Sequence, residues 1–479
     1  MTLPREIRRQ PPSTRSLQPK PLRGSSFSHT TRELGSFTVL HGANVIHLTA
    51  RQRPRRGLSG PCQPARRCHS SIHARLFPLM PTDVIEPDFV LIVEPNLTGH
   101  RWRYAEWIMQ ACADAGYPCI LVTECANGDH RLARQITAAN RPDQQIAFVD
   151  PEESRTHRLR ERNQYWRFHH YFERAFRLVS RAQSIRLVVV PYADYFFNGL
   201  AFLGSPFGKT PWIGITMRST FHHHKVGIKA PDRPVVNAIK AQLFTRAIRT
   251  PGLRTLLSID PTLPEWAAQH ASKGSAKIAY VADPFPDERA EDPALARARL
   301  GLDPAQRYLL VYGAITERKG IYELVHAMTR LEHAPTLIVA GEQDAGTRHF
   351  MRNHIRSLTP APVVLDSFIS NDMERDLFSA CDAVWLGYKG HYGMSGVLVQ
   401  AYRFGKPVIA TEDGLIGWFS RRCELGPILS DLSSASIARA ITETMTSWPH
   451  AHGSASSRDN LLAQNTLGEF KHTLLQQMA

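Results

Sequence analysis

One stretch decides the fold class: Tyr308-Leu-Leu-Val-Tyr-Gly-Ala-Ile-Thr-Glu-Arg-Lys-Gly-Ile-Tyr-Glu-Leu-Val-His-Ala327. It begins with a short apolar run typical of a buried strand, and from Gly320 onward its apolar residues recur at helical spacing. The same order recurs downstream, with strands predicted at 335–340, 363–365, 383–386 and 407–410 and helices at 320–331, 372–380 and 396–404. Apolar strands that alternate with helices indicate a parallel sheet covered on both faces.

The first half of the chain repeats this pattern. Strands are predicted at 89–93, 119–123, 145–149, 187–190 and 212–215, with a helix at 104–115, and the segment 283–306 has the Pro-rich composition of a linker. We therefore expect an α/β fold of two tandem doubly wound Rossmann-like domains, 88–285 and 306–450, that face each other across a cleft. A C-terminal helix in 455–479 is expected to pack back on the first domain. Ligands of open parallel sheets bind beyond the carboxyl ends of the strands, which places the site in the cleft.

Composition sets limits on the class of protein. The chain has 479 residues, of which 43% are hydrophobic and 21% charged, as is ordinary for a globular protein. No run of 18 apolar residues occurs, so no transmembrane helix is predicted. The seven cysteines include no Cys-x-x-Cys pair, which argues against a disulfide framework or a zinc site and favours a reducing, cytoplasmic setting.

Charge is concentrated at the N-terminus. The chain carries a net charge of +15, and residues 1–80 alone account for +12 of it. Because the body is nearly neutral, we expect no nucleic-acid partner. Residues 1–80 lack sustained apolar periodicity, which leaves three interpretations: a disordered basic segment, an organelle-targeting peptide, or a start site assigned too far upstream, with Met80 as the functional start.

A helix predicted between 152 and 182 has two interpretations. Aromatic and aliphatic residues form one stripe along it, and eight arginines lie between Arg155 and Arg181. One interpretation is a surface helix packed on the sheet by its stripe. The other is an interfacial helix that touches anionic lipid, which would place the protein peripherally on the inner face of a membrane.

Two blocks resemble a known family. The stretch 312–327 and the stretch Tyr392-Gly-Met-Ser-Gly-Val-Leu-Val-Gln-Ala-Tyr-Arg-Phe-Gly-Lys-Pro-Val-Ile-Ala-Thr411 are similar to the retaining GT-B glycosyltransferases of family 4. The resemblance implies a nucleotide-sugar donor in the C-terminal half and a glycan, lipid-linked or small-molecule acceptor in the N-terminal half. It also implies retention of configuration, with no metal and no cofactor besides the donor.

The chemistry of these blocks suits a diphosphate. Arg318 and Lys319 lie at the start of a helix, where cations oppose the helix dipole, so a phosphate contact explains them better than a solvated charge does. Ser395 and Gly396 open the next helix after further glycines, which lets backbone N–H groups approach a phosphate or a sugar ring. The alternative for these glycines is an ordinary turn.

The chain also departs from the family pattern. Two family glutamates correspond to Tyr392 and Gln400, and the family's phosphate-binding arginine corresponds to Ala314. Gln400 is still able to hydrogen-bond ribose hydroxyls, whereas Tyr392 supplies no carboxylate. A catalytically silent binding protein on the same fold is therefore one alternative, and a sugar-nucleotide epimerase is another.

The first domain contributes further candidates. Gly99 and His100 lie in a loop that resembles the family's donor-phosphate loop, and Arg218 and His222 lie nearest to its acceptor-side catalytic histidine. The histidines 222–224 are consecutive and are expected to point in different directions, so no metal site is predicted. The chain has no Asp-x-Asp, no G-x-G-x-x-G after the first strand and no P-loop.

Overall fold

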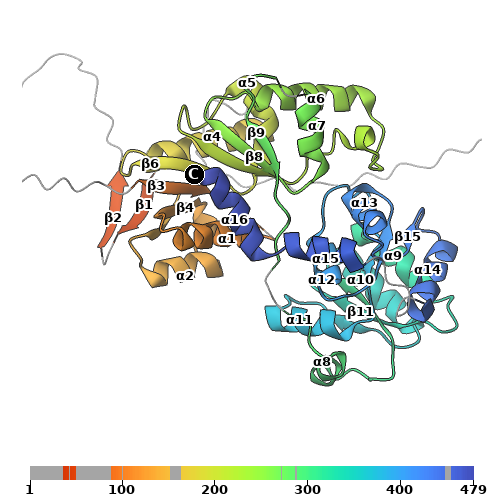
Figure 1. Ribbon diagram of the computed structural model, residues 1–479. Helices are drawn as coiled ribbons and strands as arrows, with labels where there is room; N and C mark the ends of the chain where they lie inside the picture. Colours follow the sequence, from red (N-terminus) through yellow and green to blue (C-terminus); the bar gives the residue numbers. More distant parts are fainter. Residues whose placement is uncertain are drawn as a thin grey trace, which may run out of the picture.

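The computed structural model describes residues 36–41, 44–49, 88–99, 101–150, 163–270, 272–285, 289–447 and 455–479. These residues form two α/β domains, each built on its own sheet (Figure 1). The first sheet has the order β2-β1-β5-β4-β3-β6-β7-β8-β9, and the second has the order β12-β11-β10-β13-β14-β15. The prediction of two tandem Rossmann-like domains is confirmed.

Seven parallel strands form the body of the N-terminal sheet. They are β3 (Phe89–Val93), β4 (Cys119–Thr123), β5 (Gln144–Phe148), β6 (Ile185–Val190), β7 (Trp212–Thr216), β8 (Leu253–Ser258) and β9 (Lys277–Tyr280). Its main helices are α1 (Arg101–Asp114), α2 (Arg131–Ala139), α4 (Gln164–Val179), α5 (Leu200–Leu203), α6 (Pro234–Ala247) and α7 (Thr262–His270). Two further strands, β1 (Ser36–His41) and β2 (Asn44–Thr49), lie within the basic segment and extend the sheet antiparallel beside β5. The three interpretations of residues 1–80 stay predictions.

The C-terminal sheet is parallel throughout. Its strands are β10 (Tyr308–Tyr312), β11 (Thr336–Ala340), β12 (Val363–Leu365), β13 (Ala383–Leu386), β14 (Val408–Thr411) and β15 (Ile428–Leu429). The helices are α8 (Pro293–Leu300), α9 (Ile321–Met328), α10 (Ala345–His354), α11 (Asn371–Ala380), α12 (Gly396–Arg403), α13 (Gly414–Arg422) and α14 (Ser434–Ser447). Helix α8 lies inside the predicted linker and is tied to α11, because Arg299 donates two hydrogen bonds to the Asp376 carboxylate.

Apolar side chains cover both faces of each sheet, as the continuous apolar strands predict. The stripe predicted along 152–182 follows this rule where the structure describes it. Phe172 and Val179 of α4 are buried in the core and Phe168 packs against it, so α4 is a surface helix held by its aromatic face. Residues 151–162 lie outside the described part of the chain.

The C-terminal segment returns to the N-terminal domain. After α15 (Ala455–Gln464), helix α16 (Leu467–Met478) packs on α1 (Figure 1). Phe470 meets the ring of Tyr104 edge-on at 5.6 Å, and Lys471 pairs with Asp114 at 2.9 Å. Among the described residues no helix is both long enough and apolar enough to span a bilayer.

Candidate active site

Loops that follow strands of both sheets meet between the two domains. The loop after β13 touches the loop after β7: a Cβ placed on Gly393 would lie 3.4 Å from the carbonyl oxygen of Met217. Met394, from the same C-terminal loop, packs against the N-terminal core. The carboxyl ends of the strands therefore face one site, as expected for open parallel sheets.

Lys319 is an internal residue of this site. It ends the short 3-10 helix η5 (Glu317–Lys319) and is only 5% exposed. Its Nζ donates to the carbonyl of Tyr312 at 2.6 Å and to the hydroxyl of Tyr388 at 2.7 Å. An ammonium group carries three N–H donors, so one remains for a ligand. The alternative of a solvated charge does not describe this side chain.

A glycine allows this arrangement. Gly320 has a φ of 66°, and a Cβ there would lie 2.1 Å from the carbonyl oxygen of Gly387. Only a residue without a side chain lets the β10–α9 loop lie against the loop after β13. This contact holds Lys319 beside Tyr388.

His391 lies close to the predicted cation Arg318 and within the electrostatic influence of Lys319 and Arg218. Nη1 of Arg318 lies 2.8 Å from Nδ1 of His391, and Nε2 of the imidazole lies 3.0 Å from the carbonyl of Met394. Burial lowers the pKa of His391, the Met394 carbonyl opposes this, and the charges of Arg318, Lys319 and Arg218 lower the pKa further. A neutral ring that donates from Nε2 and accepts at Nδ1 fits these contacts. The positive charge of this region therefore resides on the arginines and the lysine.

The residues that open α12 lie beside this region. Ser395 is 8% exposed and precedes Gly396, whose backbone begins the helix. Gln400, one turn further on, is buried, and its Oε1 accepts no hydrogen bond from any described residue. Tyr392 lies in the loop before the helix; burial raises its pKa, and the Asp413 carboxylate raises it further.

On the opposite side, the N-terminal domain presents a buried polar chain. Glu94 follows β3, and its Oε1 accepts a hydrogen bond from the hydroxyl of Tyr195 at 2.9 Å. Arg101 donates to that same hydroxyl at 2.7 Å, and its guanidinium lies over the rings of Tyr192 and Tyr195 at 5.5 Å. Burial raises the pKa of Glu94 to about 8. This carboxyl group is therefore protonated at neutral pH.

Arg218 lies beside this wall, and its charge also acts on His391 of the C-terminal domain. Its guanidinium lies 5.6 Å from the ring of Tyr192. The loop that carries it is fixed by Asp194, which accepts hydrogen bonds from the Thr216 hydroxyl at 2.8 Å and from the Met217 N–H at 2.7 Å. Arg218 itself is exposed, so its charge is available to a ligand.

The other N-terminal candidates fall into different places. Gly99 has a φ of 63° with open space around it, and His100 lies outside the described residues. His222 is fully buried, and its Nε2 lies 3.0 Å from the Thr262 hydroxyl and 3.1 Å from Oδ2 of Asp260. The structure therefore does not bring His222 together with the other predicted residues.

The expected divergence of the three histidines is wrong for two of them. Nε2 of His223 lies 2.9 Å from the same Asp260 oxygen that His222 contacts, because His222 stands just before the 3-10 helix η4 (His223–Val226) that turns both rings inward. The ligand atoms of His222, His223 and Asp260 lie within 4.8 Å of one another. The other carboxylate oxygen accepts from the N–H and hydroxyl of Thr262. This carboxylate is thus fully hydrogen-bonded by the protein.

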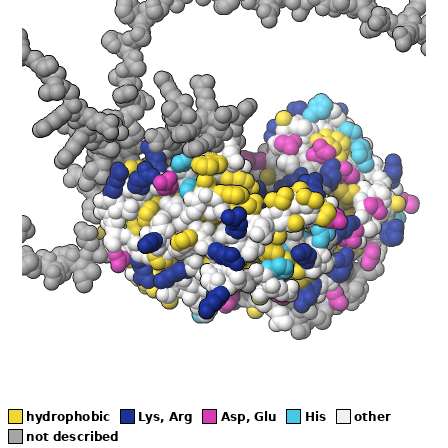
Figure 2. Space-filling model, turned by 90° about the horizontal axis from the view of Figure 1, so that it is seen from above, with side chains coloured by type: hydrophobic (Ala, Val, Ile, Leu, Met, Phe, Trp, Pro, Cys, Tyr) yellow, Lys and Arg dark blue, Asp and Glu magenta, His cyan; other side chains and the backbone are white. Residues whose placement is uncertain are grey.

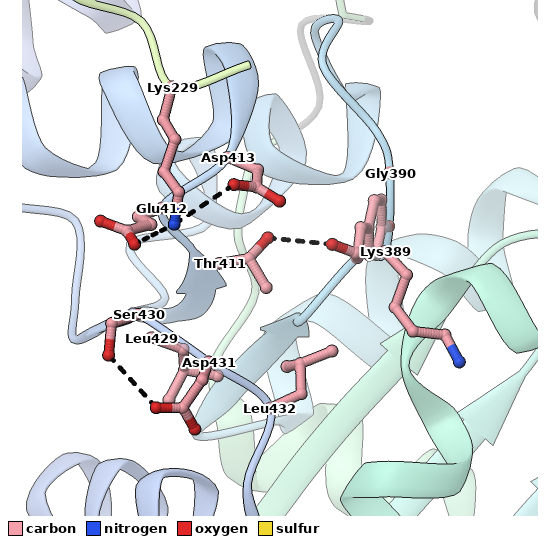
Figure 3. Close-up of a pocket in the computed structure, with 11 residues that line it drawn as sticks. Lys229, Lys389, Gly390, Thr411, Glu412, Asp413, Leu429, Ser430, Asp431 and Leu432 are labelled. Carbon is pink, nitrogen blue, oxygen red and sulfur yellow. Dashed lines mark hydrogen bonds and ion pairs between the residues drawn. The ribbon is translucent and has the colours of Figure 1, made fainter. Parts of the chain in front are cut away.

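A cavity of about 240 Å³ adjoins Tyr388 (Figure 3). Lys229 of the N-terminal domain reaches into it, pairs with Glu412 and lies 3.7 Å from Asp413. The Thr411 hydroxyl, which also lines the cavity, donates to the carbonyl of Tyr388 at 3.1 Å. Asp431 adds a third carboxylate to the lining. This cavity suits a group rich in hydroxyls better than it suits a phosphate.

Several of these residues were not singled out from the sequence. Glu94 is a lone acid directly after an all-apolar strand, and such an acid often lies at the carboxyl edge of a sheet. His391 lies between Gly390 and Gly393. A histidine in a glycine-containing loop after a buried strand is a pattern that indicates a functional loop residue, and it could have been used here. No local sequence pattern pointed to Arg101 or Tyr195, because their hydrogen bond joins segments that are 94 residues apart in the chain.

Comparisons with known proteins agree with this architecture. Residues 306–447 match the family described as "Glycosyl transferases group 1". The curated "Putative teichuronic acid biosynthesis glycosyltransferase TuaC" of Bacillus subtilis (strain 168) is 29% identical over 147 residues, which are 30% of this chain and 35% of that protein. The match therefore spans about a third of the length of this relative.

Solved structures show the fold of the whole body. Sucrose-phosphate synthase (tll1590) from Thermosynechococcus elongatus is similar with a TM-score of 0.61 at 14% identity, over 82% of this chain and 98% of that one. Anabaena Alr3699/HepE in complex with UDP-glucose has a TM-score of 0.55 at 14% identity, over 81% and 99% of the two chains. The chain thus has the GT-B fold, and residues 306–447, which carry Lys319 and α12, are the part that matches the group 1 glycosyltransferase family.

Proposed function

We propose that this chain is a glycosyltransferase that moves a sugar from a nucleotide-sugar donor to a glycan or lipid-linked acceptor. One observation carries the proposal: Nη1 of Arg318 lies 2.8 Å from Nδ1 of His391, and the charges of Arg318, Lys319 and Arg218 all act on this ring. Departure of a nucleoside diphosphate builds negative charge on phosphate oxygens. Preorganised cations in a partly buried site stabilise that charge. The group 1 match over residues 306–447 supports the same reaction.

The donor fits the site in two parts. The free N–H of Lys319 and the guanidinium of Arg318 hold the diphosphate, with the N-terminus of α12 beside them. Gln400 reads the ribose, and its unpartnered Oε1 is the acceptor that a hydroxyl would use. Because relatives in the fold are solved with UDP and UDP-glucose, a uridine nucleotide is the first donor to test.

The acceptor enters from the N-terminal side. Arg218 lies at the boundary between the Tyr192 wall and the cations around His391, so it contacts the leaving phosphate or the incoming hydroxyl. Following the resemblance to family 4, we propose retention of configuration. The absence of Asp-x-Asp from the sequence supports transfer without a bound divalent ion.

Release of UDP from UDP-glucose and other UDP-sugars tests the proposal. Wild type should release UDP, and Arg218→Ala should lower kcat by about a hundredfold to a thousandfold, the range for losing one oxyanion-type contact. Arg254→Ala removes an exposed arginine from β8 and serves as the matched control. Donor binding without release by wild type under any acceptor condition would favour the silent binding protein instead.

A further inference from the structure

An exposed apolar surface covers α5 and the start of α6. Seven large hydrophobic side chains are exposed in the described part of the chain, and four of them belong to these two helices. They are Phe202 (71% exposed), Val235 (70%), Val236 (44%) and Ile239 (55%). Helix α5 packs against α6, and both lie at the top of the N-terminal domain in Figure 1. These four residues are called the α5–α6 surface below.

Folding makes little use of this part of α6. Only Phe244 and Ala247, in its last two turns, are buried. Arg233 occupies the N-cap position, but its side chain forms no capping hydrogen bond with the helix. The first turn contains no acidic residue. A cation at this end opposes the helix dipole, and β-branched residues are poor helix formers. The composition of the first two turns of α6 is therefore better explained by contact with something outside the domain than by folding of the domain itself.

The α5–α6 surface lies in a basic part of the chain. Nine lysines and arginines, all exposed, occur between residues 195 and 259, where Asp232 is the one acid. Asp194 and Asp260 flank this range, and Lys229 within it pairs with Glu412. Lys209, Lys240 and Arg246 form no ion pair with any residue that the structure describes. Figure 2 looks down on this face and shows hydrophobic side chains with Lys and Arg among them. Apolar helical residues bordered by cations are typical of proteins that lie on anionic bilayers.

This surface adjoins the acceptor side of the candidate site. A small pocket is lined by Lys240 of α6 together with Arg218, Asp194 and Asn198. A molecule held in a bilayer beneath α6 would therefore present its polar head next to Arg218. The arrangement connects membrane contact with the place where an acceptor is expected.

We propose that the α5–α6 surface docks on an anionic phospholipid bilayer, so that the enzyme takes a lipid-borne acceptor. The acceptor part rests on the proposed function, whereas the docking part does not. A second copy of the chain fits less well, because four side chains cover roughly a few hundred Å², against about 800 Å² per partner in a stable interface. Two copies of a basic surface also repel each other.

Co-sedimentation of the full chain with vesicles tests the docking. The vesicles contain phosphatidylcholine alone or with phosphatidylglycerol, and the variant is Val235→Asp/Ile239→Asp. The matched control is Leu295→Asp/Phe368→Asp, two residues of the C-terminal half that are 59% and 73% exposed. The basic segment 1–80 is present in every protein, so its attraction to anionic lipid cancels in the comparison. If the aspartate pair does not fold, Val235→Ser/Ile239→Ser replaces it.

The expected result is at least a tenfold lower partition onto phosphatidylglycerol vesicles for the α6 variant and less than a twofold change for the control. No loss in either variant would overturn the proposal and assign binding to the N-terminal segment. Equal losses in both variants would also overturn it, because the α5–α6 surface would then have no specific part in binding. A change from dimer to monomer with unchanged vesicle binding would overturn it in favour of a second copy. UDP affinity, measured in parallel without vesicles, should be the same in all proteins. If wild type does not bind UDP, the proposed function is contradicted, whereas the conclusion about vesicle docking is unaffected.

Discussion

The buried carboxyl of Glu94 makes the stability of the N-terminal domain depend on pH. Glu94 is fully buried; one oxygen accepts from Tyr195 and from the N–H of Asn96, and Oε2 has no partner among the described residues. Burial raises its pKa to about 8, against smaller opposing effects of those hydrogen bonds and of Arg101. The folded protein therefore keeps a proton that the unfolded chain has released.

The sign and size of the effect follow from the two pKa values. The contribution is fully present below the unfolded value of 4.5 and is lost as the pH rises through about 8. Each pKa unit corresponds to about 1.4 kcal/mol, so the loss across this window reaches roughly 5 kcal/mol at most. That is a large part of the stability of an ordinary domain.

Urea unfolding from pH 5 to pH 9 measures this in wild type and Glu94→Gln. The amide cannot ionise, so the free energy of unfolding of the variant should rise relative to wild type by several kcal/mol over this range, most of it below pH 8. Glu265→Gln, at an exposed glutamate of α7, controls for the loss of an acidic side chain. A constant difference between wild type and Glu94→Gln across the range would refute the reasoning. It would mean that water reaches this carboxyl in the folded state.

Three further outcomes concern the donor site. Lys319→Met should weaken binding of a nucleoside diphosphate by roughly 1.5–3 kcal/mol, because it removes one charge-assisted contact. The affinity for the bare nucleoside should stay unchanged. Calorimetric titration of both ligands measures this, and a loss of affinity for the nucleoside alone would contradict it. Gln400→Leu should cost donor affinity on the order of 1–3 kcal/mol, whereas Gln400→Glu should be tolerated. Equal donor affinity in wild type and Gln400→Leu would show that α12 does not read the ribose. Turnover should persist in excess EDTA, because the chain has no Asp-x-Asp; a complete loss of rate that zinc or manganese restores would overturn metal independence.

The fold was largely predictable because most strands are buried on both faces. Such strands are continuous apolar runs, and β10 begins at Tyr308 and ends at Tyr312 as predicted. Among the strands that escaped prediction, β8 and β9 lie toward one end of the sheet, where β9 is the edge strand, and they carry exposed charges at Arg254 and Lys277. An edge position does not require a continuous apolar run, so the sequence pattern there is weak.

The site was predictable only in part, because sequence order does not report burial. Arg318 and Lys319 were singled out from their place between a strand and a helix. In the structure Arg318 contacts His391 and Lys319 is buried against Tyr388, and their role in donor binding stays a prediction. His222 stands equally close to the end of a strand, yet its ring turns into the domain toward Asp260, 38 residues further along the chain. The partner of a side chain is decided by the packing of distant segments, and a single sequence does not show that packing.

The departures from the family pattern are best judged by charge in space rather than by position in sequence. Ala314 lacks a guanidinium, but Arg318 contacts His391, and the charge of Arg218, from a different loop, also lowers the pKa of this histidine. Tyr392 lacks a carboxylate, but the charge of Asp413 acts on it directly. We infer that the chain keeps the charges of a donor site while drawing them from new positions. Because Arg218 belongs to one domain and the other groups belong to the second, this site is complete only while the domains are closed on each other.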